Sequence, residues 1–254
     1  MSTPPGALYL VPNTLDFGTD AATSPIEDVL PASVLRTAAR LTHWVAENAK
    51  TTRAFLKRVD AVVPLAQPLQ ALAIVELPRP AKGARGSTAD LAALLDPARQ
   101  GHDIGLISEA GLPGVADPGA ALVQAAHAAG IEVVALAGPS SLVLALAASG
   151  LNGQSFAFVG YLPVDASARA ARIRELEALS RRTGQTQLMI ETPYRNEALL
   201  GALLAHLQPA TRVSVSCGLT LPTGFTRTDD VNGWKARPIK LPADVPVVFS
   251  MLAG

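Results

Sequence analysis

Residues 104–119 read IGLISEAGLPGVADPG, a short apolar run followed at once by a turn-rich segment. The run Ile104–Ile107 has the length and composition of a buried strand. Residues 111–119 then hold three glycines and two prolines, which favour tight, irregular turns. A buried strand that ends in such a turn is typical of an open α/β sheet, where ligands bind beyond the carboxyl ends of the strands.

The same alternation of short apolar runs and helical patterns extends along the chain. Strands are predicted over residues 8–11, 44–46, 104–107, 132–136, 156–159, 187–190, 212–216 and 247–251. Helices are predicted over residues 32–41, 51–59, 87–95, 120–129, 140–148, 166–182 and 193–207. Ser24 is expected to cap a further helix that begins at Pro25, with Glu27 completing a capping box. This pattern predicts an α/β fold, and the proline-rich region 64–86 is expected to be loop or irregular strand.

Length and composition exclude several classes of protein. The 254 residues, 49% of them hydrophobic and 17% charged, are unlike a disordered chain. A single cysteine and four isolated histidines predict no disulfide framework and no metal site. The chain has no phosphate-binding P-loop, dinucleotide fingerprint or Gly-x-Ser-x-Gly elbow. With no membrane-length apolar run and no signal-like start, we expect a soluble, cytoplasmic protein.

Four turns share one placement, directly after a predicted strand. They are residues 12–14, 108–114, 137–141 and 191–195. Small residues in such turns let backbone groups approach a ligand, and two of the turns also begin predicted helices, at Ser140–Ser141 and Thr192–Pro193. Each turn alone is compatible with an ordinary strand-to-helix connection. The shared placement of all four favours a pocket.

The basic residues are concentrated although the formal net charge is zero. Residues 36–58 hold six basic side chains against one acid, Glu47, and Lys50, Arg53 and Lys57 fall on one face of a predicted helix. Two further basic segments are residues 79–85, with Arg79, Lys82 and Arg85, and residues 169–182, with five arginines. These segments are either solvated faces or a confined track for a polyanion.

Several of these motifs together resemble the tetrapyrrole methylase superfamily, and within it the ribosomal RNA small-subunit methyltransferase I branch. The resemblance is carried by residues 8–12, 107–119, 136–141, 148–151, 156–163 and 191–195. It implies S-adenosylmethionine as cofactor, a homodimer, and two α/β lobes in tandem with the cofactor cleft between them. The lobes are expected over residues 1–114, on the substrate side, and 115–254.

Position by position, the resemblance also implies which residues hold the cofactor. They are Pro12, Leu15, Gly111, Leu112, Pro113, Val115, Ser140, Ser141, Glu191, Thr192 and Leu219. The first loop, residues 12–15, is expected to lie toward the substrate and the methyl group.

Three motifs depart from the branch. The first loop, usually Pro-Thr-Pro-Ile-Gly-Asn-Leu, is Pro-Asn-Thr-Leu-Asp at residues 12–16. The Ala-Glu-Asp-Thr-Arg motif becomes residues 46–50, which keep Glu47 and lose the aspartate. The late Arg-Glu-Leu-Thr-Lys motif becomes residues 217–221, without three of its polar groups. The cofactor side therefore matches the branch better than the substrate side.

The resulting hypothesis is an S-adenosylmethionine-dependent methyltransferase acting on a ribose 2′-hydroxyl of RNA. An alcohol acceptor must lose its proton, and Glu47 is the candidate base, beside Arg53 as a second catalytic candidate that grips phosphate. Lys50, Lys57 and Arg195 are the candidate substrate-binding residues. In the alternative interpretation, Glu47 pairs with Lys50 or Arg53 on the surface and Arg195 is a helix-surface charge. Alternative functions are methylation of a small planar or peptide substrate, and cofactor binding without catalysis.

Overall fold

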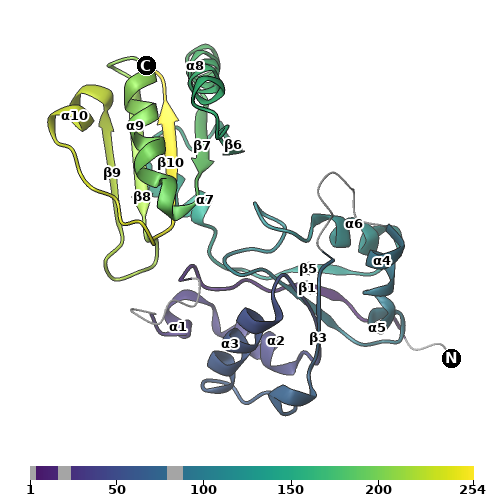
Figure 1. The fold of residues 1–254 in the computed structure, drawn as a ribbon. Helices are drawn as coiled ribbons and strands as arrows, with labels where there is room; N and C mark the ends of the chain where they lie inside the picture. Colours follow the sequence, from purple (N-terminus) through teal and green to yellow (C-terminus); the bar gives the residue numbers. More distant parts are fainter. Residues whose placement is uncertain (1–3, 17–23, 79–87) are drawn as a thin grey trace. The chain divides into compact units, whose positions relative to one another are not determined.

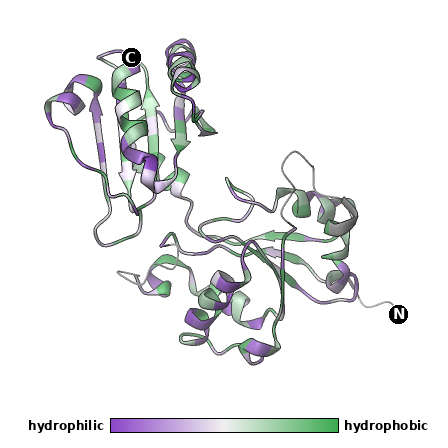
Figure 2. Cartoon of the chain, viewed as in Figure 1, coloured by the Kyte–Doolittle hydropathy of each residue, from purple (hydrophilic) through white to green (hydrophobic). Residues whose placement is uncertain are grey.

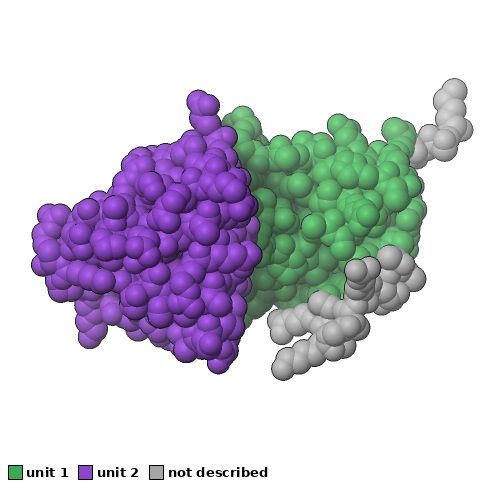
Figure 3. Space-filling model, turned by 90° about the horizontal axis from the view of Figure 1, so that it is seen from above, with its two compact units in different colours: residues 1–140 green, residues 141–254 purple. Residues whose placement is uncertain are grey.

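The computed structural model describes residues 4–16, 24–78 and 88–254. The chain divides into two compact units, residues 1–140 and 141–254 (Figures 1 and 3). Each unit contains one five-stranded sheet with helices packed on it, so the predicted α/β class is confirmed.

The sheet of the first unit is parallel throughout its described strands. Its strands are β1 (Leu8–Leu10), β2 (His43–Ala46), β3 (Ala73–Glu76), β4 (Ile104–Ile107) and β5 (Val133–Ala135). They lie in the order β3-β2-β4-β1-β5. Because all five run in the same direction, the loops that follow β1, β4 and β5 leave the same edge of the sheet at neighbouring positions.

Helices cover both faces of this sheet. They are α1 (Ile26–Val29), α2 (Ala32–Arg40), α3 (Ala49–Asp60), α4 (Thr88–Ala93), α5 (Asp96–Arg99) and α6 (Ala120–Ala128), with a 3₁₀ turn, η1 (Leu69–Ala71). Strand side chains alternate between two cores. Trp44 packs with residues of α1–α3, while its neighbour Val45 packs with residues of α4–α6.

The sheet of the second unit is mixed. Its strands are β6 (Phe156–Tyr161), β7 (Thr186–Ile190), β8 (Arg212–Cys217), β9 (Phe225–Asp230) and β10 (Val247–Leu252), in the order β6-β7-β10-β8-β9. Only β6 and β7 pair in parallel, and the other three pairings are antiparallel.

The helices of the second unit also occupy both faces of their sheet. They are α7 (Ser141–Ser149), α8 (Ala166–Thr183), α9 (Asn196–His206) and α10 (Val231–Ala236), with a 3₁₀ turn, η2 (Pro193–Arg195). One core contains residues of α8, α9 and α10, and a smaller one contains residues of α7. Helix α8 carries both hydrophobic and hydrophilic residues, as a helix on a sheet surface does (Figure 2).

The boundary between the units differs from the sequence expectation. It falls at Ser140/Ser141 and not after residue 114. The reason is sheet pairing, since β5 follows residue 114 and adds to β1 as an edge strand of the first sheet.

Local structure also differs from prediction in four places. Ser24 does not cap α1, whose N-cap is Pro25 without a side-chain hydrogen bond. The predicted helix over residues 193–207 begins as the 3₁₀ turn η2, and the region 64–86 contains the regular strand β3. The pair β9 and α10 is unpredicted. Ser87, the first residue of the helix predicted over residues 87–95, lies outside the described residues. Among the helices that the structure describes, none is long and apolar enough to cross a membrane.

Candidate functional site

Three of the four predicted turns meet in the first unit. Asn13 forms an isolated antiparallel bridge with Gly111, and its backbone N–H donates to the Gly111 carbonyl at 2.9 Å. Gly138 lies so close to Pro12 that an added Cβ would stand 2.2 Å from the proline Cβ. An added Cβ on Gly111 would stand 3.3 Å from the Leu15 side chain and 3.4 Å from the Pro139 carbonyl. The turns after β1, β4 and β5 therefore form one packed edge.

The turn after β4 has an unusual backbone. Gly111, Gly114 and Gly119 have φ angles of +65°, +79° and +132°, which suit glycine. Ala116 has a φ of +66°, a strained value for a residue with a side chain. Within this turn Pro113 is buried, Leu112 is half-buried, and the Val115 side chain is 44% exposed. The glycines explain how this segment folds into a compact loop.

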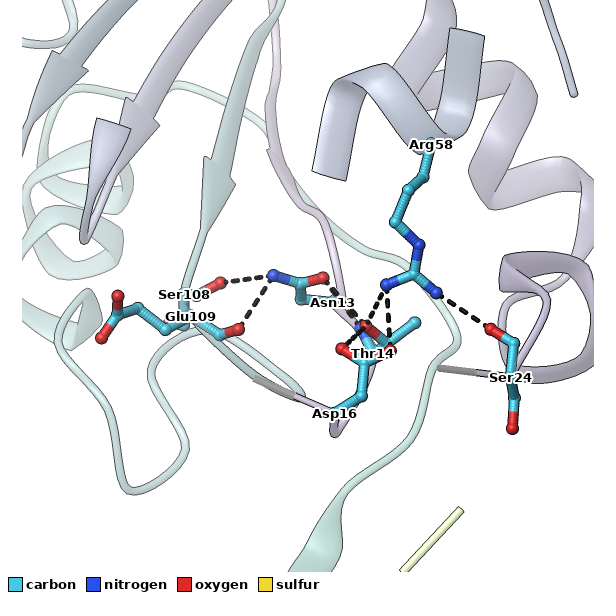
Figure 4. A network of polar contacts seen from close by, with 7 residues as sticks. All are labelled: Asn13, Thr14, Asp16, Ser24, Arg58, Ser108 and Glu109. Atoms are coloured by element: carbon cyan, nitrogen blue, oxygen red, sulfur yellow. Dashed lines mark hydrogen bonds and ion pairs between the residues drawn. The ribbon is translucent and has the colours of Figure 1, made fainter. Parts of the chain in front are cut away.

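The first loop is a buried polar network (Figure 4). Asn13 Nδ2 donates to the carbonyls of Ser108 and Glu109, at 3.2 and 3.0 Å. Thr14 Oγ1 donates to Asp16 Oδ1 at 2.8 Å, and Arg58 of α3 donates to both Thr14 Oγ1 and Asp16 Oδ2. The residues that differ from the usual loop sequence of the branch thus form hydrogen bonds to the turn after β4 on one side and to α3 on the other.

Glu47 lies beside the turn after β4. Its Oε2 accepts the backbone N–H of Glu109 at 3.0 Å. Within the described part of the chain, no ion pair joins Glu47 to Lys50 or Arg53, so surface pairing does not occupy it. The sequence does not single out Asp117, yet burial and the nearby carboxylates of Glu47 and Glu109 raise the pKa of Asp117 to about 7. Asp117 lies within the motif of residues 107–119, and this position is the sequence feature that could have identified it.

The candidate phosphate-binding residues lie on α3. Asn48 caps this helix, since its side chain accepts the N–H groups of Lys50 and Thr51. Lys50, Arg53 and Lys57 are all exposed, as predicted for one solvent face, and Arg53 Nη1 donates to the Ala49 carbonyl one turn earlier. Arg58, which the sequence groups with them only by charge, is half-buried in the loop network instead.

The remaining predicted residues are placed as follows. Ser140 is the last residue of the first unit, and Ser141 begins α7 in the second. Glu191, after β7, is buried, and its Oε1 accepts the Thr192 N–H at 2.9 Å while its Oε2 pairs with Arg195 at 3.0 Å. Arg195 is therefore half-buried and held in an ion pair, and it is not a free charge on the surface of a helix. Leu219 packs against the core that contains α7.

Several of the other basic side chains that the structure describes are engaged in ion pairs. Arg79, Lys82 and Arg85 lie outside the described residues. Arg40 pairs with Asp103 at 2.5 Å. In α8 of the second unit, Arg172 pairs with Glu175 and Arg181 lies 3.9 Å from Glu177. Among the described residues, no group of three or more His, Cys, Asp and Glu side chains has an arrangement that could hold a metal ion.

The fold has counterparts in known proteins. Residues 32–229 match the family model of the Tetrapyrrole (Corrin/Porphyrin) Methylases, and because this match takes in well over half of the chain, the chain belongs to that family. The predicted superfamily is thereby confirmed. Over the whole fold, the chain is similar to the crystal structure of the methyltransferase CobJ, with a TM-score of 0.57, 17% identity, and coverage of 98% of this chain and 95% of that one.

Two relatives carry the name ribosomal RNA small subunit methyltransferase I. The chain is 41% identical over 102 residues to the protein of Vibrio cholerae and 39% identical over 120 residues to that of Mesorhizobium japonicum. These matches cover 40% and 47% of this chain. They span only 34% and 40% of the two relatives.

Proposed function

We propose that this protein is an S-adenosylmethionine-dependent methyltransferase that modifies RNA, with a ribose 2′-hydroxyl of ribosomal RNA as acceptor. The observation that carries the proposal is the packed edge of three turns, found in a chain of the methylase family. The names of the two bacterial relatives support RNA as the substrate class.

Features of the first unit fit this cofactor. The turn after β4 has the glycine backbone that lets peptide groups approach a ligand closely. Among the described residues, Ser108 Oγ at the start of this turn is buried without a hydrogen-bond partner, as expected beside a ligand-binding segment. Glu47, Glu109 and Asp117 give the turn an acidic character, which suits a cationic sulfonium.

The proposed cofactor-binding residues are those that the family resemblance implies. In the first unit they are Pro12, Leu15, Gly111, Leu112, Pro113, Val115 and Ser140. In the second they are Ser141, Glu191, Thr192 and Leu219. Since Glu191 already accepts the Thr192 N–H and pairs with Arg195, its role in this assignment is to fix the turn after β7.

When bound, S-adenosylmethionine supplies a methyl group on a good leaving group, so the protein contributes mainly alignment and exclusion of water. Glu47 is the proposed proton acceptor for the hydroxyl, and the Glu109 N–H holds its carboxylate in place. Arg53, Lys50 and Lys57 on the exposed face of α3 are proposed to bind RNA phosphates. Arg195 is a weaker candidate for substrate contact, because Glu191 already binds it.

Two finer parts of the proposal concern the state of the protein in the cell. A homodimer is implied by the family resemblance and is tested by light scattering. A cytoplasmic location follows from the proposed substrate, because ribosomal RNA is processed there in bacteria, and is tested by cell fractionation.

The experiment that tests the function follows tritiated methyl groups from S-adenosylmethionine into separated RNA, protein and small molecules. We expect label in RNA, at a ribose oxygen after nuclease digestion. Label in small molecules or protein alone would refute RNA as the substrate and support methylation of a small planar or peptide substrate. Calorimetric binding of S-adenosylmethionine without any methyl transfer would support a non-catalytic binding module. Absence of binding would refute both the methyltransferase and the binding module.

A further inference from the structure

The first loop contains buried polar side chains that need hydrogen-bond partners. Asn13, Thr14 and Asp16 are 6%, 2% and 6% exposed. Buried amide, hydroxyl and carboxylate groups are unfavourable unless each one is hydrogen-bonded. In this chain these three residues replace the usual loop sequence of the branch, and their hydrogen bonds join them both to one another and to groups outside the loop.

Arg58 is one such partner, and it binds three groups at once. Its Nη1 donates to Thr14 Oγ1 at 3.2 Å and to Asp16 Oδ2 at 2.9 Å. Its Nη2 donates to the Ser24 carbonyl at 3.0 Å (Figure 4). A planar guanidinium can hold several acceptors in a fixed fork, whereas a lysine ammonium acts as a compact point charge.

The contacts continue from this fork to the proposed cofactor turn. Thr14 N–H donates to Asn13 Oδ1 at 2.9 Å, and Asn13 Nδ2 donates to the carbonyls of Ser108 and Glu109. Glu109 N–H in turn binds the carboxylate of Glu47. A connected path of hydrogen bonds thus runs from α3, through the first loop, to the candidate base.

We propose that Arg58 is a positioning residue for methyl transfer, which fixes the first loop against the turn after β4 so that donor, acceptor and Glu47 are aligned. This inference rests on the proposed function. The Arg58 guanidinium is half-buried and bonded to the loop, whereas Lys57, its neighbour in sequence, is exposed and is one of the proposed RNA-binding residues. A misplacement of about 1 Å at such a site is enough to lower the rate about 100-fold.

The test compares Arg58→Lys with Arg99→Lys. Arg99 is a matched control, because it also pairs with an aspartate, Asp96, but on an exposed surface in α5. The probes are tritiated S-adenosylmethionine and unmethylated small-subunit ribosomal RNA transcribed in vitro. We expect Arg58→Lys to lower the rate at saturating concentrations of both by at least about tenfold. We expect the RNA dissociation constant to stay within about twofold, since the charge is kept. Arg99→Lys should change neither quantity.

A purely structural role would give a different pattern. In that case the loss of rate would match the loss of folded protein, measured by circular dichroism at the assay temperature, and the inference would be wrong. Partial recovery of Arg58→Ala by added methylguanidinium, without recovery of an equally slow Leu112→Glu variant, supports positioning by the guanidinium. No recovery, or a rate for Arg58→Lys within twofold of wild type, overturns it.

Failure of the proposed function is recognised separately. If the wild-type protein transfers no methyl group to this RNA, the proposed function fails, and hydrogen exchange then decides the role of Arg58. Faster exchange of backbone amides at residues 13–16 and 109–111 in Arg58→Lys, but not in Arg99→Lys, supports loop positioning. Unchanged exchange refutes it.

Discussion

Asp117 carries a carboxyl group that is easier to protonate in the folded protein than in the unfolded chain. Burial, with the repulsion of Glu47 and Glu109, raises its pKa to about 7 from the usual 3.8. The protonated form is therefore the favourable one in the fold. The stability that Asp117 contributes is fully present below its unfolded pKa and is lost as the pH rises through about 7.

We predict that Asp117→Asn stabilises the protein more at pH 8 than at pH 5, because asparagine carries no charge to bury. The measurement is urea denaturation at both values of pH. Asp28→Asn, at an exposed carboxylate, is the control and should show no such difference. A stabilisation by Asp117→Asn that is equal at pH 5 and pH 8 would contradict the raised pKa of Asp117.

Gly138 tests the packing of the turns. An alanine there would place its Cβ 2.2 Å from Cβ and 2.4 Å from Cγ of Pro12, a rigid ring that cannot rotate away. We predict that Gly138→Ala lowers the free energy of unfolding by about 1–3 kcal/mol and weakens binding of S-adenosylmethionine. Thermal denaturation and calorimetry measure the two effects. Gly153→Ala, where nothing lies within 4 Å of the added Cβ, should be close to wild type in both.

At the scale of elements, α3 shows how a departure from the family pattern keeps its structural role. Asn48 stands where the related motif has aspartate, and its side chain accepts the backbone N–H groups of Lys50 and Thr51. Both residue types are good N-caps. The substitution therefore preserves the helix that presents the basic face.

We predict that Asn48→Ala costs about 1 kcal/mol of stability, because two N–H groups at the helix start lose their acceptor. Asn48→Asp should be neutral or stabilising, since a carboxylate also interacts favourably with the positive end of the helix dipole. Urea denaturation of the two variants beside wild type makes the comparison. No loss of stability in Asn48→Ala would show that the cap contributes nothing, and equal losses in both variants would show that aspartate does not replace asparagine as the cap.

Elements with strong periodicity and clear end signals are predictable from this sequence. Strand β4 has the predicted bounds, Ile104–Ile107, and α6 ends one residue before the predicted end, with Gly130 beyond it at a φ of +67°. Strand β9 reads FTRTDD and has no apolar alternation, so only pairing with β8 reveals it. The boundary at residue 140 likewise depends on a sheet pairing, that of β5 with β1, which local patterns do not contain.

The candidate site also has parts that the sequence predicts and parts that depend on long-range packing. Turns after predicted strands are visible in sequence, and three of the four do meet. Helical spacing places Lys50, Arg53 and Lys57 on an exposed face. The same reasoning cannot separate Arg58 from them by function, because its role depends on which loop packs against the other side of α3. For the same reason Glu191 and Arg195 appear as separate candidates in sequence although they form one ion pair.

For the whole molecule, 21 basic and 21 acidic residues give a formal net charge of zero. This balance does not mean that charge is spread evenly. Several arginines are engaged in pairs, such as Arg40 with Asp103 and Arg58 with Asp16. The exposed basic face of α3 remains as the described surface proposed for RNA phosphates, so RNA binding should depend on where charge lies more than on its total.

Two triple variants of equal charge separate these possibilities. Replacing Lys50, Arg53 and Lys57 by alanine gives a formal net charge of −3, and so does replacing Arg99, Lys235 and Lys240, which are exposed elsewhere. Each RNA phosphate contact contributes roughly 0.7–0.9 to the slope of log affinity against log salt concentration. We predict that the α3 variant loses RNA affinity at low salt and that its slope becomes shallower by about 2–3, while the second variant keeps the wild-type slope. Filter binding of small-subunit ribosomal RNA between 50 and 200 mM salt, roughly the range over which such contacts weaken, measures both slopes. Equal changes in the two variants would mean that RNA senses only the overall charge, and α3 would lose its assignment.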